Sequence, residues 1–223
     1  MYLNESIEKY LNDSAAGIPA PGGGSVSALI GALASAMASM SIHFTVGKQG
    51  SEQNTGRLKE LLKECEKSRE VLTALIQEDV DVYNEVDKTF RMPQITSDEK
   101  KFRLESMIRA TMFAMMVPLK TAMSCLYVLK LTRELAEITN PNLMSEVGVA
   151  AILADAGFQC GKINVDINLL HMNNRGMIQK VQNEMHQAEK TAKIYFNEIY
   201  KIVQKKLWGE NKLFKLCYGM ENK

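Results

Sequence analysis

The chain has few of the residues that hold metal ions, disulfide frameworks or nucleic-acid backbones. It has three histidines and four cysteines in 223 residues, and the cysteines lack the close paired spacings of metal sites. Its 27 lysines and arginines nearly balance 26 aspartates and glutamates, so charge gives no reason to expect nucleic acid or an anionic membrane as a partner. We therefore predict no metal site. We expect a cytoplasmic protein in which the four cysteines are reduced and mostly buried: Cys65, Cys125, Cys160 and Cys217.

The sequence also lacks the patterns of strands and of separate domains. Only five prolines interrupt it, and we find no polar and apolar alternation, long linker or internal repeat. Glu5 and Glu8 interrupt the first residues, so no signal peptide is predicted. The expected fold is all-α: a single-domain bundle of long antiparallel helices over residues 1–223, with a tail at 209–223.

Glycine and proline gather in one segment, Ile18-Pro-Ala-Pro-Gly-Gly-Gly-Ser25. The prolines fix the backbone, Gly22, Gly23 and Gly24 permit dihedral angles that other residues avoid, and Ser25 is placed to cap a following helix. A loop whose backbone is this constrained usually holds particular groups in a fixed position. No strand precedes it, and no lysine and hydroxyl follow it directly, so it matches a phosphate-binding loop only weakly.

The run from Ser25 to Val46 contains no acidic residue, lysine or arginine. Large side chains recur at alternating steps of four and three residues and form one stripe, the large stripe: Val26, Ile30, Leu33, Met37, Met40 and Phe44. A second stripe is small: Ser27, Gly31, Ser35 and Ser39. Large apolar side chains favour burial of one face, and small residues on the other face let the backbone of another helix approach closely. We therefore expect a central, fully enclosed helix. The alternative is a membrane span. The length of the run fits one, but its high content of alanine, glycine and serine and its lack of basic or aromatic flanking residues argue against it.

The remaining apolar periodicity predicts further helices. A short one at about 4–15 precedes the uncharged run, and long ones at about 51–92, 96–139 and 176–208 follow, with another after Ser145. Thr96 and Glu99 are spaced for a capping box, and Ser145 is placed to cap its helix. Pro118 should bend or divide the helix in which it lies.

The helix after Ser145 also has two stripes. One is apolar: Val149, Ile152, Ala156, Cys160, Ile163, Ile167 and Leu170. The other changes from small to polar along its length: Ala150, Ala154, Gly157, Gly161, Asn164, Asn168 and His171. Asn164 and Asn168, one turn apart, either bind a polar ligand or tie helices together.

Asp79 lies on the apolar seam of the 51–92 helix, between Leu75 and Val82. An unpaired carboxylate is costly to bury there and should have a raised pKa. The position fits a functional carboxylate and equally a structural ion pair or hydrogen bond. Two other candidates lie near the end of the uncharged run. His43 is either a cleft residue or a hydrogen-bonding core residue, and Lys48, in a glycine-flanked turn, either holds an anionic group or is an ordinary surface lysine.

Six motifs occur in order along nearly the whole chain: Pro19-Ala-Pro-Gly-Gly-Gly-Ser-Val26, Thr45-Val-Gly-Lys48, Glu78-Asp79 before Tyr83-Asn84, Met92-Pro93 with Thr96 and Glu99, Ser145-Glu-Val-Gly-Val-Ala-Ala151, and Asn164-Val-Asp-Ile-Asn-Leu169. They resemble the formimidoyltetrahydrofolate cyclodeaminase and methenyltetrahydrofolate cyclohydrolase family. The resemblance implies an all-α, cyclodeaminase-like homodimer of the free-standing form. It also implies a one-carbon tetrahydrofolate as substrate and no cofactor beyond it.

The resemblance also assigns roles to residues. Asp79 matches the family's catalytic aspartate, in agreement with the argument from its seam. We expect substrate to be bound by nine residues, Lys48 among them for the glutamate tail: Gly22, Gly23, Gly24, Ser25, His43, Lys48, Ser145, Asn164 and Asn168. The chain departs from the family pattern at Gln94, where lysine is usual, at Glu146, where aspartate is usual, and at Thr139, where glycine is usual.

The first expectation for function is 5-formimidoyltetrahydrofolate cyclodeaminase, in which N10 attacks the formimidoyl carbon and ammonia leaves. Asp79 would act as general base and then as general acid. The alternative is 5,10-methenyltetrahydrofolate cyclohydrolase, with water as the nucleophile. A second alternative is a non-enzymatic helical interaction protein. No nucleic acid or membrane partner is expected.

Overall fold

The computed structural model describes residues 1–208, and all of its regular structure is helical. The α-helices are α1 (Ile7–Ala15), α2 (Gly23–Thr45), α3 (Thr55–Phe90), α4 (Ser97–Ile138), α5 (Met144–Leu170) and α6 (Arg175–Trp208). Short 3-10 helices are η1 (Tyr2–Asn4), η2 (Glu52–Asn54) and η3 (Pro141–Leu143). No strand occurs in this range, so the all-α prediction is confirmed. The predicted tail at 209–223, with Cys217, lies outside the described residues.

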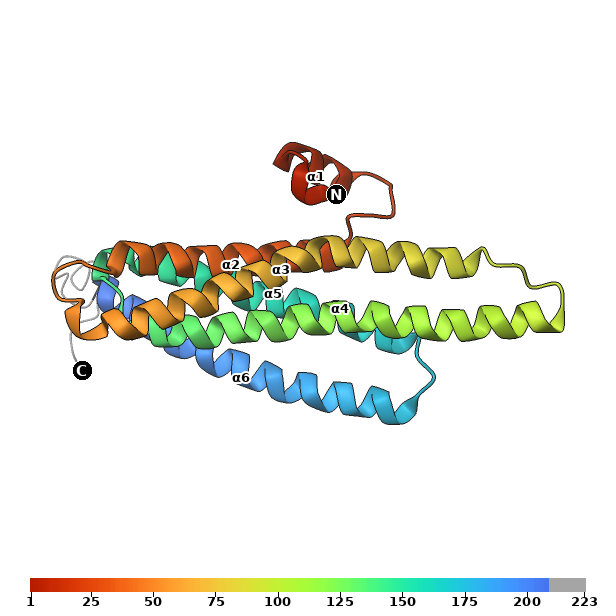
Figure 1. Cartoon of the computed structure of the whole chain (residues 1–223). Helices are drawn as coiled ribbons and strands as arrows, with labels where there is room; N and C mark the ends of the chain where they lie inside the picture. Colours follow the sequence, from red (N-terminus) through yellow and green to blue (C-terminus); the bar gives the residue numbers. More distant parts are fainter. Residues whose placement is uncertain (209–223) are drawn as a thin grey trace.

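The helices form an elongated bundle in which α3 and α4 run side by side and extend beyond the others, while α1 lies off one flank (Figure 1). At the far end of this pair, Thr96 accepts a hydrogen bond from the Glu99 N–H at 3.2 Å, and the Glu99 carboxylate accepts one from the Thr96 N–H at 2.9 Å. This is the predicted capping box. Pro118 does not divide its helix, because α4 continues through it as one helix. The other outcome expected for Pro118, a bend, stays a prediction.

The core is built on the small face of α2. A Cβ on Gly31 would lie 2.6 Å from the Cys125 sulfur, and a Cβ on Gly157 would lie 2.8 Å from the same sulfur and 3.3 Å from the Gly31 nitrogen. Neither position has room for a side chain, because α2, α4 and α5 approach one another closely there. The small stripe of α2 is therefore its buried stripe.

The large stripe of α2 is only partly covered, so the expectation of a fully enclosed helix is wrong for the single chain. Leu33 is 47% exposed and Phe44 is 52% exposed. The apolar stripe of α5 is exposed in the same way, with Ile163 at 67%. Close backbone packing, rather than side-chain bulk, decides which face of each helix is buried.

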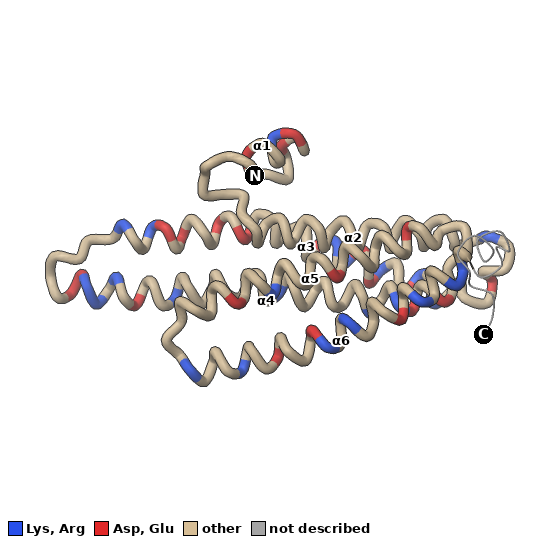
Figure 2. The backbone as a smooth tube through the Cα atoms, turned by 180° about the vertical axis from the view of Figure 1, so that it is seen from behind, with Lys and Arg blue, Asp and Glu red and all other residues tan. Residues whose placement is uncertain are grey.

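Several helices of the bundle are apolar over much of their length. Helix α2 carries no lysine, arginine, aspartate or glutamate along its length (Figure 2). Three segments of residues 1–208 are long and apolar enough to cross a membrane by length and composition alone: Gly23–Thr45, Ser97–Ile138 and Pro141–Leu170.

Candidate functional site

The carboxylate of Asp79 sits at the first turn of α2. The Ser25 N–H donates to Asp79 Oδ2 at 2.9 Å. Ser25 is the third residue of α2, so its N–H has no carbonyl partner within the helix. The positive end of the helix dipole also favours a carboxylate at this place.

The prediction that Ser25 itself caps this helix is therefore wrong. Gly22 is the residue at the cap position, and no side chain of its own segment caps the helix. A carboxylate from α3 supplies the missing acceptor. Ser145 is not a cap either: α5 begins at Met144, and the Ser145 hydroxyl donates to the Glu146 carboxylate at 2.7 Å.

The glycines allow three helices to meet at this carboxylate. A Cβ on Gly24 would overlap Asp79 Oδ1 and lie 2.6 Å from Asp79 Cγ, so the carboxylate packs directly on the α2 backbone. A Cβ on Gly23 would lie 3.4 Å from both the nitrogen and the oxygen of the Asn164 amide. Asp79 of α3, Asn164 of α5 and the glycines of α2 therefore form one cluster.

Asp79 has no counterion among residues 1–208. Burial raises the pKa of its carboxyl, and the hydrogen bond from the Ser25 N–H opposes this effect without cancelling it, so the pKa is raised overall. The two neighbouring carboxylates are exposed and have side-chain partners. Glu78 forms an ion pair with Lys120 at 3.7 Å, and Asp81 accepts a hydrogen bond from the Gln77 amide at 2.9 Å. The structural ion pair considered for Asp79 does not form in this part of the chain, whereas the hydrogen bond does.

Asn164 and Asn168 lie on the half-buried side of α5. The Asn164 amide donates to the Cys160 carbonyl at 2.9 Å, and the Asn168 amide donates to the Asn164 carbonyl at 2.7 Å. Within residues 1–208 neither side chain forms a hydrogen bond to another helix, so these bonds do not tie helices together. The arrangement is compatible with the interpretation that they bind a polar ligand.

The other three predicted substrate-binding residues lie at the opposite end of α2. His43, Lys48 and Ser145 are exposed there, near the point where the Asn140 N–H donates to Thr45 Oγ1 at 3.2 Å. At about 1.5 Å per residue, the 23 residues of α2 separate the two ends by about 35 Å. One chain therefore does not bring the predicted site residues together.

Tyr10 belongs to the Asp79 cluster and was not among the predicted site residues. Its hydroxyl lies 2.8 Å from Ser25 Oγ, and the residue is only 8% exposed. In the sequence, Tyr10 shares one face of the short predicted helix at about 4–15 with Ile7 and Leu11. No spacing rule connects that helix to residues 25 and 79, so only the fold reveals the contact.

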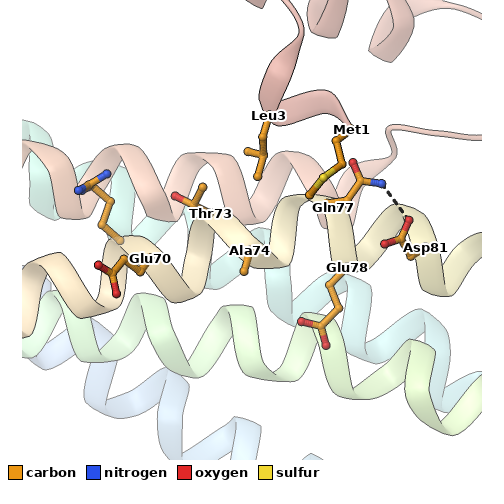
Figure 3. Close-up of a pocket in the computed structure, with 9 residues that line it drawn as sticks. Met1, Leu3, Glu70, Thr73, Ala74, Gln77, Glu78 and Asp81 are labelled. Carbon is orange, nitrogen blue, oxygen red and sulfur yellow. Dashed lines mark hydrogen bonds between the residues drawn. The ribbon is translucent and has the colours of Figure 1, made fainter.

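A surface groove between η1 and α3 lies near this cluster but is separate from it. Its walls include Met1 and Leu3 on one side and Thr73, Gln77 and Asp81 on the other, and Figure 3 shows these side chains around the outer face of α3. Asp79 is not part of its lining. Within residues 1–208, no three histidines, cysteines, aspartates or glutamates are grouped so as to hold a metal ion.

Known proteins resemble this chain along most of its length. Residues 6–187 match a family model described as Formiminotransferase-cyclodeaminase. The methenyltetrahydrofolate cyclohydrolase of Methylorubrum extorquens is 32% identical over 204 residues, which cover 92% of this chain and 98% of that protein. The formimidoyltransferase-cyclodeaminase of Rattus norvegicus is 27% identical over 191 residues, but these span only 35% of that protein. The crystal structure of formiminotetrahydrofolate cyclodeaminase from Thermotoga maritima has a TM-score of 0.83 and 26% identity, covering 93% of this chain and 100% of that one.

Proposed function

Since the chain belongs to the formiminotransferase-cyclodeaminase family of folate one-carbon enzymes, we propose that it is a 5,10-methenyltetrahydrofolate cyclohydrolase. The support is the match to the cyclohydrolase of Methylorubrum extorquens, which extends over nearly the full length of both proteins. The cyclodeaminase reaction was the first expectation from the sequence, although the motifs do not separate the two reactions. The similarity to a cyclohydrolase favours the alternative.

The geometry of Asp79 carries the chemical part of the proposal. In the cyclohydrolase reaction, water attacks the carbon that bridges two nitrogens, and one carbon–nitrogen bond then breaks. The water must lose a proton and the departing nitrogen must gain one. A single carboxylate can do both in turn if its pKa is closer to neutrality than that of an ordinary aspartate. Asp79 is half-buried, has a raised pKa and is held in place by the Ser25 N–H.

A pH dependence follows from the direction of this shift. Asp79 must be ionised to accept a proton from water, so kcat/KM should rise with pH through the pKa of Asp79. This midpoint should lie above the value of about 3.9 that is typical of aspartate. The measurement is methenyl hydrolysis between pH 4 and pH 8, after subtraction of the uncatalysed rate. A midpoint at the ordinary aspartate value would contradict the assigned role.

Cyclodeaminase is the second candidate, because the free-standing Thermotoga maritima enzyme shares the fold over its whole chain. Two parallel assays distinguish the reactions, one with methenyltetrahydrofolate and one with formimidoyltetrahydrofolate, in which ammonia release is followed. Rapid methenyl hydrolysis with slow ammonia release supports the proposal, and the reverse supports the cyclodeaminase. A folded protein that is inactive in both assays would point to the non-enzymatic helical protein.

We also propose that the protein is a homodimer, formed by two antiparallel copies of α2. The large stripe of α2 is symmetric about Ser35: Val26 mirrors Phe44, Ile30 mirrors Met40, and Leu33 mirrors Met37. Alternating steps of four and three are the spacing by which two helices interlock. Helix α5 packs against α2, and we propose that its exposed stripe extends the contact. A two-fold axis near Ser35 would cover the apolar surface of both chains.

This dimer would also complete the site. Under the same symmetry Gly22 mirrors Lys48, so the partner's Lys48 would lie beside the glycines and Asp79 of the first chain. The partner's His43 and the partner's Ser145 would approach from the same end. All nine predicted substrate-binding residues could then surround one folate, with the partner's Lys48 placed for the glutamate tail. We propose no cofactor beyond the folate, and a cytoplasmic location.

Subunit complementation tests the shared site. Asp79→Asn and Lys48→Ala should each have little activity at substrate concentrations well below KM. When the two variants are mixed and exchange subunits, each mixed dimer has one site with both native residues. Random exchange should restore about a quarter of wild-type activity. Sedimentation without detergent should show a dimer. No recovery in mixed dimers would show that each chain holds a complete site, and a protein soluble only in detergent would point to a membrane.

A further inference from the structure

Tyr10 connects the N-terminal segment to the catalytic cluster through a directed pair of hydrogen bonds. The Ser25 hydroxyl donates to the Ile76 carbonyl at 2.9 Å. A hydroxyl has a single hydrogen, so Ser25 Oγ can only accept in its 2.8 Å contact with Tyr10. Tyr10 is therefore the donor. Burial raises the pKa of the Tyr10 phenol, the hydrogen bond with Ser25 opposes this effect without cancelling it, and the nearby negative charge of Asp79 adds to it, so the donor stays protonated.

This chain of hydrogen bonds ends at Asp79. Ser25 contacts α3 twice, through its hydroxyl at Ile76 and through its N–H at Asp79 Oδ2. Ile76 and Asp79 are three residues apart and so lie on the same turn of α3. Any movement of Ser25 relative to this turn would therefore change the position of the one hydrogen bond that the Asp79 carboxylate accepts within residues 1–208.

Tyr10 is also the main anchor of its own helix. It is the only buried residue of α1, whereas Ile7 is 81% exposed, and Figure 1 shows α1 beside the bundle. The ring of Tyr2 packs edge-on against the ring of Tyr10, with centroids 5.5 Å apart. The Tyr2 hydroxyl, in contrast, binds Asp13 at 3.0 Å and the Ala20 carbonyl at 3.1 Å, away from Ser25.

We propose that Tyr10 is a positioning residue for the reaction: by donating to Ser25 it fixes the N–H that holds the Asp79 carboxylate. The inference rests on the proposed function. Tyr10 touches no reacting atom, so its loss should lower the rate of the chemical step and leave substrate binding nearly unchanged.

The test compares Tyr10→Phe with Tyr2→Phe. Both variants keep the paired rings and lose one hydroxyl from the same segment, but only the first breaks the bond to Ser25. Loss of one hydrogen bond that controls geometry should lower kcat by about tenfold, with KM within about twofold of wild type. Tyr2→Phe should retain wild-type kcat. Equal kcat values for the two variants would overturn the proposal.

A double variant excludes an unrelated loss of stability. If Tyr10 acts through Ser25, then Tyr10→Phe combined with Ser25→Ala should be no slower than Ser25→Ala alone. Effects that multiply would show that the residues act separately and would overturn the proposal. If Tyr10→Phe does not fold in a thermal melt, Ser25→Ala breaks the same bond from its other side, and wild-type kcat in that variant would be equally decisive. Wild-type protein inactive on both folates would remove the proposed function, and this inference with it.

Discussion

Asp79→Asn is expected to lower kcat by about a thousandfold, which is within the range for loss of a general acid–base group. An asparagine amide has nearly the same shape and can still accept the hydrogen bond from the Ser25 N–H. It cannot accept a proton from water or pass one to a departing nitrogen. The change therefore separates the proton-transfer role from the structural role at one position.

The matched control is Asp81→Asn, two residues along α3. Asp81 is exposed and accepts a hydrogen bond from Gln77, so its loss should change kcat by less than about twofold. Both variants are assayed with the better folate substrate and melted in parallel. More than a tenth of wild-type turnover in a folded Asp79→Asn variant would exclude Asp79 as the general base.

Stability should respond to pH in a characteristic way. The pKa of Asp79 is higher in the folded protein than in the unfolded chain, so the folded state binds the proton more tightly. The free energy of unfolding should therefore fall as pH rises from the unfolded to the folded pKa. Asp79→Asn should lose this decline and be at least as stable as wild type at pH 7, as thermal melts between pH 4 and pH 8 would show.

The helices and the central residue of the candidate site could be predicted from sequence because each has a local signal. Periodicity placed the long helices, and Thr96 with Glu99 marked the start of α4. Asp79 stood out because a carboxylate on an apolar seam is costly unless it has a purpose. The structure places it against Gly24 and near Asn164, as the interpretation of a common site requires.

Other features depend on tertiary contacts that leave no local pattern. Helix α2 has two stripes that both looked fit for burial, and only the close packing around Gly31 shows that the small stripe is inside. Ser25 looked like a helix cap, because the sequence gives no sign that a carboxylate from another helix takes that place. Nothing in the sequence connects Tyr10 to Ser25 or to Asp79.

Gly24→Ala should have the second-largest effect on activity. The new Cβ would overlap Asp79 Oδ1, so either the carboxylate must rotate or the first turn of α2 must shift. Both movements would displace Asp79 from the Ser25 N–H. Because small displacements of a catalytic group are costly, we expect kcat/KM to fall by about a hundredfold, measured with the same folate substrate as for Asp79→Asn. Overpacking should also destabilise the fold by about 1–3 kcal/mol, measured by denaturant unfolding.

The sign of the stability change makes this prediction specific. Alanine is favoured over glycine in helices by up to about 1 kcal/mol, so a glycine with free space around it should become more stable on substitution. Gly56, at the start of α3, has nothing within 4 Å of its Cβ position and provides this control. Gly56→Ala should be neutral or stabilising with unchanged activity, whereas Gly24→Ala should lose both stability and activity. If Gly24→Ala also gained stability and kept its rate, the carboxylate could not pack on the α2 backbone as described, and the geometric basis for Asp79 catalysis would be lost.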